Sequence, residues 1–312
     1  MSGFWLVELF DKLCPIAPYL IAHPTGVGSM LRSVLATFIF FSFQVSANEF
    51  CNKPEGIESL TANQNVRYII FGELHGNKET PNLFSESVCT LAASGKKVVV
   101  GIEHSKLTKD AYLTFMESEG TKEDEEHFLK GSDFATPFER AFGLTSEAMF
   151  DMIKKMRLFK QSGLDITVVP FVSYSGSVSG LSKSQTPYEK ELAANLIEYR
   201  EQYAADILMV LVGNIHAMKS QARGLPFEPM AMHFPSDSTL SINLVYTGGD
   251  SWYCSKECGI QEVKSSSDDS NVGFKISGEP LVSDDEEKLS SGYSGVFNLG
   301  EITASPPVSL SK

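Results

Sequence analysis

The stretch Val66–Gly76, VRYIIFGELHG, carries the clearest signal for the fold of this 312-residue chain. Its apolar run, Val66–Phe71, is nearly continuous and does not alternate strictly with polar residues. Such a run is typical of a strand covered on both faces, and strands of that kind usually belong to parallel sheets. Glu73 and His75 follow directly. The pair either caps the strand end or performs chemistry there.

Three further apolar runs follow the first, at Lys97–Ile102, Asp165–Val172 and Asp206–Val212. Helical patterns separate the runs, at Pro81–Ala93, Thr145–Gln161 and Pro187–Ala204. The second pattern begins with a good N-cap residue, Thr145, and Gly163 follows its end. Strands that alternate with helices predict an α/β fold, in which a largely parallel sheet is flanked by helices.

Two regions depart from simple alternation. Lys106–Phe142 is charged, helical in tendency and longer than a crossover requires, so we expect a helical insertion after the second strand, over one edge of the sheet, that acts as a lid. Residues 263–292 are acidic and rich in serine, which favours a mobile surface loop. Strand-like pieces extend the sheet at its edge, at Ser241–Tyr246, Gly273–Ile276 and Gly295–Leu299. We therefore expect one α/β domain over residues 60–250, followed by the loop and edge strands of residues 251–312.

The region before the first strand has the features of an export signal. Residues 30–47 combine Arg32, a short apolar core at Val34–Phe43 and small residues at Val45–Ala47, as in a secretory signal peptide cleaved after Ala47. The core is shorter than the roughly 20 residues that span a bilayer, so we expect no stable membrane anchor. Residues 1–29 lie upstream of a complete signal, and we hypothesise that translation begins at Met30. We expect an exported protein, periplasmic or secreted.

Export affects the interpretation of the cysteines. Four of the five lie after the signal, Cys51, Cys89, Cys254 and Cys258, which is an even number in an oxidising compartment. The short spacing favours a disulfide between Cys254 and Cys258, and we expect the other between Cys51 and Cys89. A zinc site is the alternative, but a single C-x3-C pattern without a second close pair matches it poorly.

Several function classes find no support in the sequence. The formal net charge of −13 and the lack of a basic block argue against nucleic-acid binding. The nucleophile elbow of α/β-hydrolases, G-x-S-x-G, is absent, since GSVSG at Gly176–Gly180 has valine at the position of the serine. No glycine-rich phosphate-binding motif follows a strand.

Acidic and imidazole side chains follow three of the four predicted strands. The first ends in Glu73 and His75, the second in Glu103 and His104, and the fourth in Asn214 and His216. Carboxyl ends of parallel strands meet at one edge of a sheet, where ligands collect. Any one of these residues has a plain structural explanation, but their coincidence predicts a functional cleft.

Two kinds of chemistry suit such a cleft. In the first, a histidine of near-neutral pKa deprotonates a water molecule while a glutamate fixes its tautomer. In the second, Glu73, His75 and His216 bind a divalent transition metal that leaves a position open for water. The residues alone do not separate these alternatives.

At these residues the sequence resembles a known superfamily. FGELHG at Phe71–Gly76, VVVGIEH at Val98–His104, LVGNIHAMK at Leu211–Lys219 and GLPFEPMAMHF at Gly224–Phe234 occur in order. They resemble the superfamily that joins erythromycin esterase-like hydrolases, ChaN-type haem-binding lipoproteins and TraB/Tiki proteins. The resemblance covers roughly Val66–Phe234. It implies an α/β fold with a helical insertion and catalytic roles for Glu73, His75, Glu103 and His216.

The three branches imply different activities. Esterase-like members activate water without a metal, and Tiki-like members use the histidine of a G-x-x-H motif, matched by Gly213–His216, in a metal-dependent peptidase site. ChaN-type members bind haem, which implies cofactor-binding roles for His104, Asn214 and Tyr174, with Tyr112 and Tyr188 as further candidates. Our leading hypothesis is an exported hydrolase of small molecules or peptides, in which His75 is the general base. Glu73 and Glu103 orient it or bind a metal, and His216 polarises the substrate or ligates the metal. The alternative is a periplasmic haem-binding protein involved in iron uptake.

Overall fold

The computed structural model describes residues 50–136, 143–173, 185–222, 224–254, 257–267, 273–281 and 292–309. The chain divides into two compact units, Met1–Phe43 and Gln44–Lys312, and every described residue belongs to the second. The predicted signal peptide, the upstream extension and Tyr174 lie outside the described residues.

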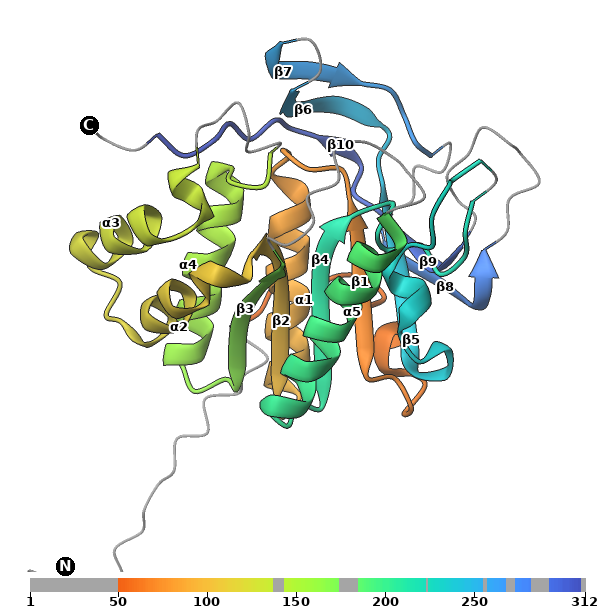
Figure 1. Cartoon of the computed structure of the whole chain (residues 1–312), viewed down its shortest axis with the longest axis horizontal. Coiled ribbons are helices and arrows are strands. Elements are labelled where there is room, and N and C mark those ends of the chain that lie inside the picture. The colour runs from red at the N-terminus through yellow and green to blue at the C-terminus, as the bar shows by residue number, and fades with distance from the viewer. Residues whose placement is uncertain are drawn as a thin grey trace, which may run out of the picture. The chain divides into compact units, whose positions relative to one another are not determined.

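A seven-stranded sheet forms the centre of this unit (Figure 1). Its strands run in the order β3-β2-β4-β1-β5-β9-β8. All neighbouring pairs are parallel except β8 and β9. The bounds are β1 Tyr68–Glu73, β2 Val98–Ser105, β3 Ile166–Val172, β4 Ile207–Gly213, β5 Thr239–Val245, β8 Gly273–Leu281 and β9 Tyr293–Asn298. The predicted largely parallel α/β fold is therefore confirmed, as are the edge strands after residue 239.

Among the described residues, five α-helices connect and cover the strands. They are α1 Glu79–Ala93, α2 Lys109–Glu117, α3 Lys122–Gly131, α4 Glu147–Gln161 and α5 Gln185–Gln202. Short 3-10 segments lie at Ile57–Thr61 (η2), Lys106–Thr108 (η3), Asp133–Ala135 (η4), Met230–His233 (η7) and Ser236–Ser238 (η8). The predicted N-cap of α4 is wrong by one residue, because the side chain of Ser146, not Thr145, accepts the hydrogen bond from the Met149 amide.

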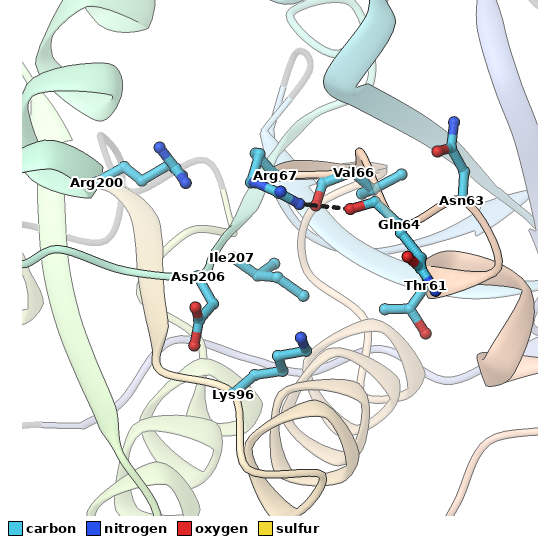
Figure 2. Close-up of a pocket in the computed structure, with 9 residues that line it drawn as sticks. All are labelled: Thr61, Asn63, Gln64, Val66, Arg67, Lys96, Arg200, Asp206 and Ile207. Atoms are coloured by element: carbon cyan, nitrogen blue, oxygen red, sulfur yellow. Dashed lines mark hydrogen bonds between the residues drawn. The ribbon is translucent and has the colours of Figure 1, made fainter.

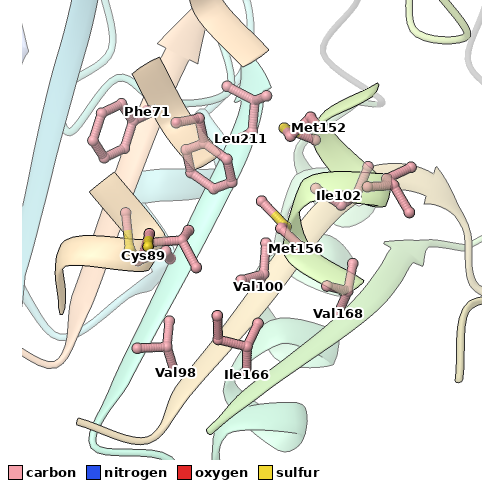
Figure 3. Packing of buried hydrophobic residues seen from close by; sticks show 14 of the residues in the cluster. Phe71, Cys89, Val98, Val100, Ile102, Met152, Met156, Ile166, Val168 and Leu211 are labelled. Atoms are coloured by element: carbon pink, nitrogen blue, oxygen red, sulfur yellow. The ribbon is translucent and has the colours of Figure 1, made fainter. Parts of the chain in front are cut away.

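Both faces of the sheet are buried, which explains the uninterrupted apolar runs. Alternate residues of β1 point to opposite sides: Ile69 and Phe71 join one core cluster, and Tyr68 and Ile70 join the other. The first cluster packs against α1, α2 and α4, and Figure 3 shows Met152 of α4 beside the strands. The second cluster packs against α5.

The predicted helical insertion is confirmed. It follows β2 and consists of η3, α2, α3 and η4. Helix α2 packs on β3, which is the edge strand of the sheet, and on α4. Stacked and tilted rings of Phe115, Phe128 and Phe150 hold the insertion against α4. The insertion thus covers the sheet edge, and its role as a lid stays a prediction.

A second, three-stranded sheet was not expected from the sequence. The strands β6 Gly248–Cys254 and β7 Cys258–Val263 form an antiparallel hairpin, and β10 Glu301–Ile302 pairs with β6. Strand β8 also extends to Leu281, into the stretch that we predicted as a mobile loop. Polar and serine-rich composition obscured both elements, because strands with an exposed face need few apolar residues.

The cysteine pairing agrees with the prediction. Disulfides join Cys51 to Cys89 and Cys254 to Cys258. Two disulfides are compatible with an exported protein, since such bonds persist in oxidising compartments. Within the part of the chain that the structure describes, no helix combines the length and apolar character needed to cross a membrane.

Candidate active site

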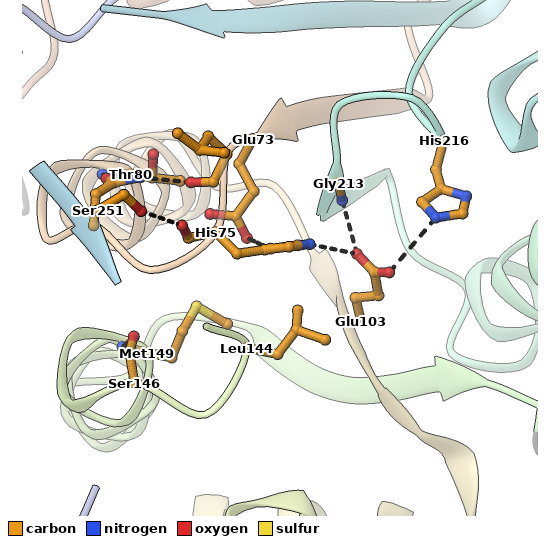
Figure 4. A network of polar contacts seen from close by, with 12 residues as sticks. Glu73, His75, Thr80, Glu103, Leu144, Ser146, Met149, Gly213, His216 and Ser251 are labelled. Carbon is orange, nitrogen blue, oxygen red and sulfur yellow. Dashed lines mark hydrogen bonds and ion pairs between the residues drawn. The ribbon is translucent and has the colours of Figure 1, made fainter. Parts of the chain in front are cut away.

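Strand order brings the predicted site residues to one edge of the sheet. β4 lies between β2 and β1, so the carboxyl ends of these three strands are adjacent. The register pairs Glu73 of β1 with Gly213 of β4. Figure 4 shows that Glu73, His75, Glu103 and His216 face one another there.

Glu73 and His75 form the first carboxylate–imidazole pair. Glu73 is 3% exposed, and its Oε1 lies 3.0 Å from Nδ1 of His75. The following residue, Gly76, has a positive φ of 85°, and a Cβ there would lie 2.0 Å from the carbonyl oxygen of Trp252. Ser251 in β6 donates a hydrogen bond to the carbonyl oxygen of His75. The unpredicted hairpin therefore holds the turn that carries His75.

Glu103 occupies the centre of the site. Its Oε2 accepts a hydrogen bond from the amide of Gly213 at 2.7 Å, which fixes the carboxylate against β4. Nε2 of His75 lies 3.7 Å from Oε2, and Nε2 of His216 lies 3.7 Å from Oε1. A separation of 3.7 Å exceeds a direct hydrogen bond, so each gap suits a bridging water or a polar substrate atom.

Glu189 and His216 form a second carboxylate–imidazole pair that the sequence analysis missed. Oε2 of Glu189 lies 2.8 Å from Nδ1 of His216 and also accepts a hydrogen bond from the Met230 amide. Its Oε1 accepts one from the side chain of Gln185, and the carboxylate is fully buried. In sequence, Glu189 looks like the other glutamates of α5, and only the packing of α5 against η7 buries it. We call the chain Glu73–His75–Glu103–His216–Glu189 the Glu–His network.

The Glu–His network changes the protonation of both histidines. Burial opposes the charged form of His75, but the charges of Glu73 and Glu103 outweigh it and raise its pKa to about 9. Burial also opposes the charged form of His216, while Glu189 and Glu103 raise its pKa above the usual value. The positive charge of His75 works against the second proton, so protonation of the two rings is coupled.

Tyr188 belongs to the surroundings of the Glu–His network. Burial and the charges of Glu103 and Glu189 raise the pKa of its phenol. Tyr188 therefore stays neutral at physiological pH and retains its proton for hydrogen bonding.

The other predicted site residues lie elsewhere. His104 faces the opposite side of β2 from Glu103, where it is 2% exposed and hydrogen-bonds to the Tyr112 hydroxyl and to the Leu144 carbonyl oxygen. Both of its ring nitrogens thus have protein partners. Asn214 contributes main-chain contacts, since its amide donates to the Glu73 carbonyl and its carbonyl accepts from Tyr293. The cofactor-binding roles of His104 and Asn214 stay predictions.

The proposed metal ligands do not converge in this arrangement. Among the described residues, no group of three or more His, Cys, Asp or Glu side chains is placed to hold a metal ion. Glu73 lies on the Nδ1 side of His75, behind the ring, whereas the Nε2 atoms of His75 and His216 face Glu103. We therefore derive no chemical step through a metal. Metal and haem binding stay predictions from the resemblance.

Comparison with known proteins places the fold but not the activity. No protein-family model matches the chain, and no curated protein matches it. A solved succinoglycan biosynthesis protein has 12% sequence identity and a TM-score of 0.61, with 84% of this chain and 97% of that chain covered. A mutant of erythromycin esterase EreC in its open conformation has 10% identity and a TM-score of 0.54, with 85% and 96% covered. This chain therefore shares the fold of an erythromycin esterase, as the resemblance implied.

Proposed function

We propose that this protein is a hydrolase that uses the Glu–His network to activate water. The observation that carries the proposal is that two imidazoles, each held at Nδ1 by a buried carboxylate, direct Nε2 toward the same central carboxylate, Glu103. A carboxylate at Nδ1 fixes the ring orientation and leaves Nε2 to exchange protons with a substrate. Two such rings supply one acid and one base.

The raised pKa values support an assignment of these roles. With a pKa of about 9, His75 carries its proton at neutral pH and is suited to donate it. The pKa of His216 is also raised, but the positive charge of His75 works against its proton. His216 therefore gives up its proton more readily than it would beside a neutral ring, and we assign it the role of general base. This differs from the hypothesis drawn from the sequence, in which His75 was the general base and His216 polarised the substrate or bound a metal. Glu103 lies between the rings and stabilises whichever of them is charged.

The reaction follows from these positions. Nε2 of His216 takes a proton from water, and the resulting hydroxide attacks the carbonyl carbon of an ester or amide. The carbon–oxygen or carbon–nitrogen bond to the leaving group then breaks, and the leaving group receives the proton of His75 Nε2. The protons balance, because His216 gains one proton and His75 loses one.

We propose that the protein acts outside the cytoplasm on a small-molecule ester or a peptide. The two disulfides support the location. The fold shared with an erythromycin esterase supports hydrolysis of a carbonyl substrate, although it shows the fold alone.

A panel of small esters and short acylated peptides tests the proposal. Turnover should fall by roughly 10²-fold or more in His75→Asn and in His216→Asn, because each variant removes a proton-transfer group. His127→Asn is the matched control, since His127 is exposed on α3. Unchanged turnover in the first two variants would reject the assignment.

A haemin titration of the same preparation tests the alternative function, haem binding. A Soret shift that depends on His216, in a protein that hydrolyses none of the substrates, would favour a haem carrier.

A further inference from the structure

A polar cavity lies at the amino ends of β1 and β4, at the opposite end of these strands from the Glu–His network. Its volume is about 420 Å³. Side chains reach it from five separate segments: the end of η2, the loop before β1, the turn after α1, the last turn of α5 and the start of β4 (Figure 2). None of the residues that line this cavity belongs to the Glu–His network.

Positive charge is concentrated in this cavity. Arg67, Lys96 and Arg200 line it, together with one carboxylate, Asp206. Three cations and one anion give a formal charge of +2, in a chain whose formal net charge is −13. Oδ2 of Asp206 already accepts a hydrogen bond from the Lys97 amide at 2.9 Å. The cavity therefore carries local positive charge that attracts anions, although the protein as a whole is acidic.

The cations retain unused hydrogen-bonding capacity. Nη1 of Arg67 donates to the carbonyl oxygens of Gln64 and Val66, which fixes the guanidinium and leaves its other nitrogens for a ligand. The Arg200 guanidinium lies over the Tyr68 ring at 5.4 Å, and its Nε is buried without a hydrogen-bond partner among the described residues. A buried donor without a partner is costly, and a ligand acceptor would remove that cost.

Helix ends explain some of these charges but not their convergence. Arg200 lies in the last turn of α5, and Lys96 follows the end of α1, where cations interact favourably with the helix dipole. The interaction with a helix dipole does not require the two side chains to point into the same cavity. Arg67 belongs to neither helix, and its guanidinium lies on the same cavity as the other two cations. A shared anionic ligand accounts for all three.

We propose that this cavity binds the phosphoryl group of a small polyhydroxylated compound, such as a sugar phosphate. Two guanidinium groups and an ammonium group match the charge of a phosphate dianion. Each planar guanidinium group can also donate a pair of hydrogen bonds to the phosphate oxygens. The side chains of Thr61, Asn63 and Gln64 line the same cavity and supply the hydroxyl and amide groups that bind sugar hydroxyls. The cavity is also larger than a bare phosphate requires.

Calorimetric titration of the purified protein with glucose 6-phosphate, orthophosphate and glucose tests this site. We expect saturable 1:1 binding of glucose 6-phosphate, weaker binding of orthophosphate and no binding of glucose. The affinity should fall roughly tenfold in Lys96→Gln and further in Lys96→Gln combined with Arg200→Gln. Lys97→Gln is the control, because it removes the same charge from the adjacent position, which does not line the cavity.

The outcomes separate this site from the Glu–His network. Binding should persist in His216→Asn, which removes the proposed catalytic base. Absence of saturable binding, an equal loss in Lys97→Gln, or equal affinity for orthophosphate would overturn the proposal. The Lys96→Gln variant keeps the test valid if Arg200→Gln fails to fold, since Lys96 is an exposed residue.

Discussion

His75 and His216 approach the same carboxylate, with each Nε2 atom 3.7 Å from a different oxygen of Glu103. The two rings come from different strand ends, and each is held from behind by its own glutamate. Glu73 acts on the protonation of His75 and Glu189 on that of His216, whereas the central carboxylate, Glu103, acts on both rings.

Replacement of Glu103 by glutamine should lower the pKa of both histidines. The charge of Glu103 raises both values, and glutamine keeps the shape of the side chain while removing that charge. Turnover should fall roughly 10²-fold or more at neutral pH. NMR titration of the histidine ring protons checks the shift, and an unaltered titration curve of His75 would contradict the prediction.

The pH dependence of turnover should be bell-shaped. Activity requires a neutral His216 and a charged His75, so it should rise as His216 loses its proton and fall as pH passes through about 9, the pKa of His75. A profile of kcat/KM for the free enzyme reports both limbs. Loss of activity that begins well below pH 8 would argue against His75 as the acid.

Folding stability should also depend on the protonation of His75. Its pKa rises from 6.5 to about 9 on folding, so the charged ring stabilises the fold fully below pH 6.5. That contribution, on the order of 3 kcal/mol, is lost as the pH rises from 6.5 through 9. Urea unfolding of the wild type and of His75→Asn at pH 6 and pH 9.5 checks it. The variant should lose less stability between these two pH values, and equal losses would contradict the prediction.

Substitution of Glu189 by glutamine should impair turnover although Glu189 does not face the substrate. Glutamine replaces one carboxylate oxygen by an NH2 donor, so it cannot accept at both positions, from His216 and the Met230 amide on one side and from the Gln185 side chain on the other. It also no longer favours the charged ring. We expect kcat to fall by roughly 10²-fold with little change in KM, and the limb assigned to His216 to move to lower pH. Glu198→Gln, on the exposed side of the same helix, is the control. A loss of stability without a shifted pH profile would indicate a purely structural role.

Local sequence patterns were sufficient for the parallel strands of the large sheet and for four of the five residues of the Glu–His network. The apolar runs located the first four strands of the chain, because burial on both faces leaves an uninterrupted pattern. Glu73, His75, Glu103 and His216 followed from the ends of these strands. Glu189 could not be predicted, because its burial comes from contact between α5 and a distant 3-10 segment. The hairpin that binds the His75 turn was missed for a similar reason, since its anchor to Gly76 and His75 spans more than 170 residues. His104 lies apart from the Glu–His network because residues adjacent in a strand face opposite sides.

Substitution of Gly76 by alanine should weaken both the fold and the activity. Gly76 has a φ of 85°, and an added Cβ would lie 2.0 Å from the Trp252 carbonyl oxygen, so β6 must move away from the turn that carries His75. Gly95→Ala is a matched control, because Gly95 has a φ of 83° and no atom lies within 4 Å of its added Cβ. The control isolates the backbone strain of about 1 kcal/mol. We expect Gly76→Ala to lower the free energy of unfolding by several times that amount. We also expect it to reduce turnover, because the movement of β6 displaces the ring of His75 from Glu103.

Thermal and urea unfolding of both variants, with turnover measured on the folded fraction, checks this. Equal destabilisation by the two alanines would show that the hairpin does not hold the turn of His75.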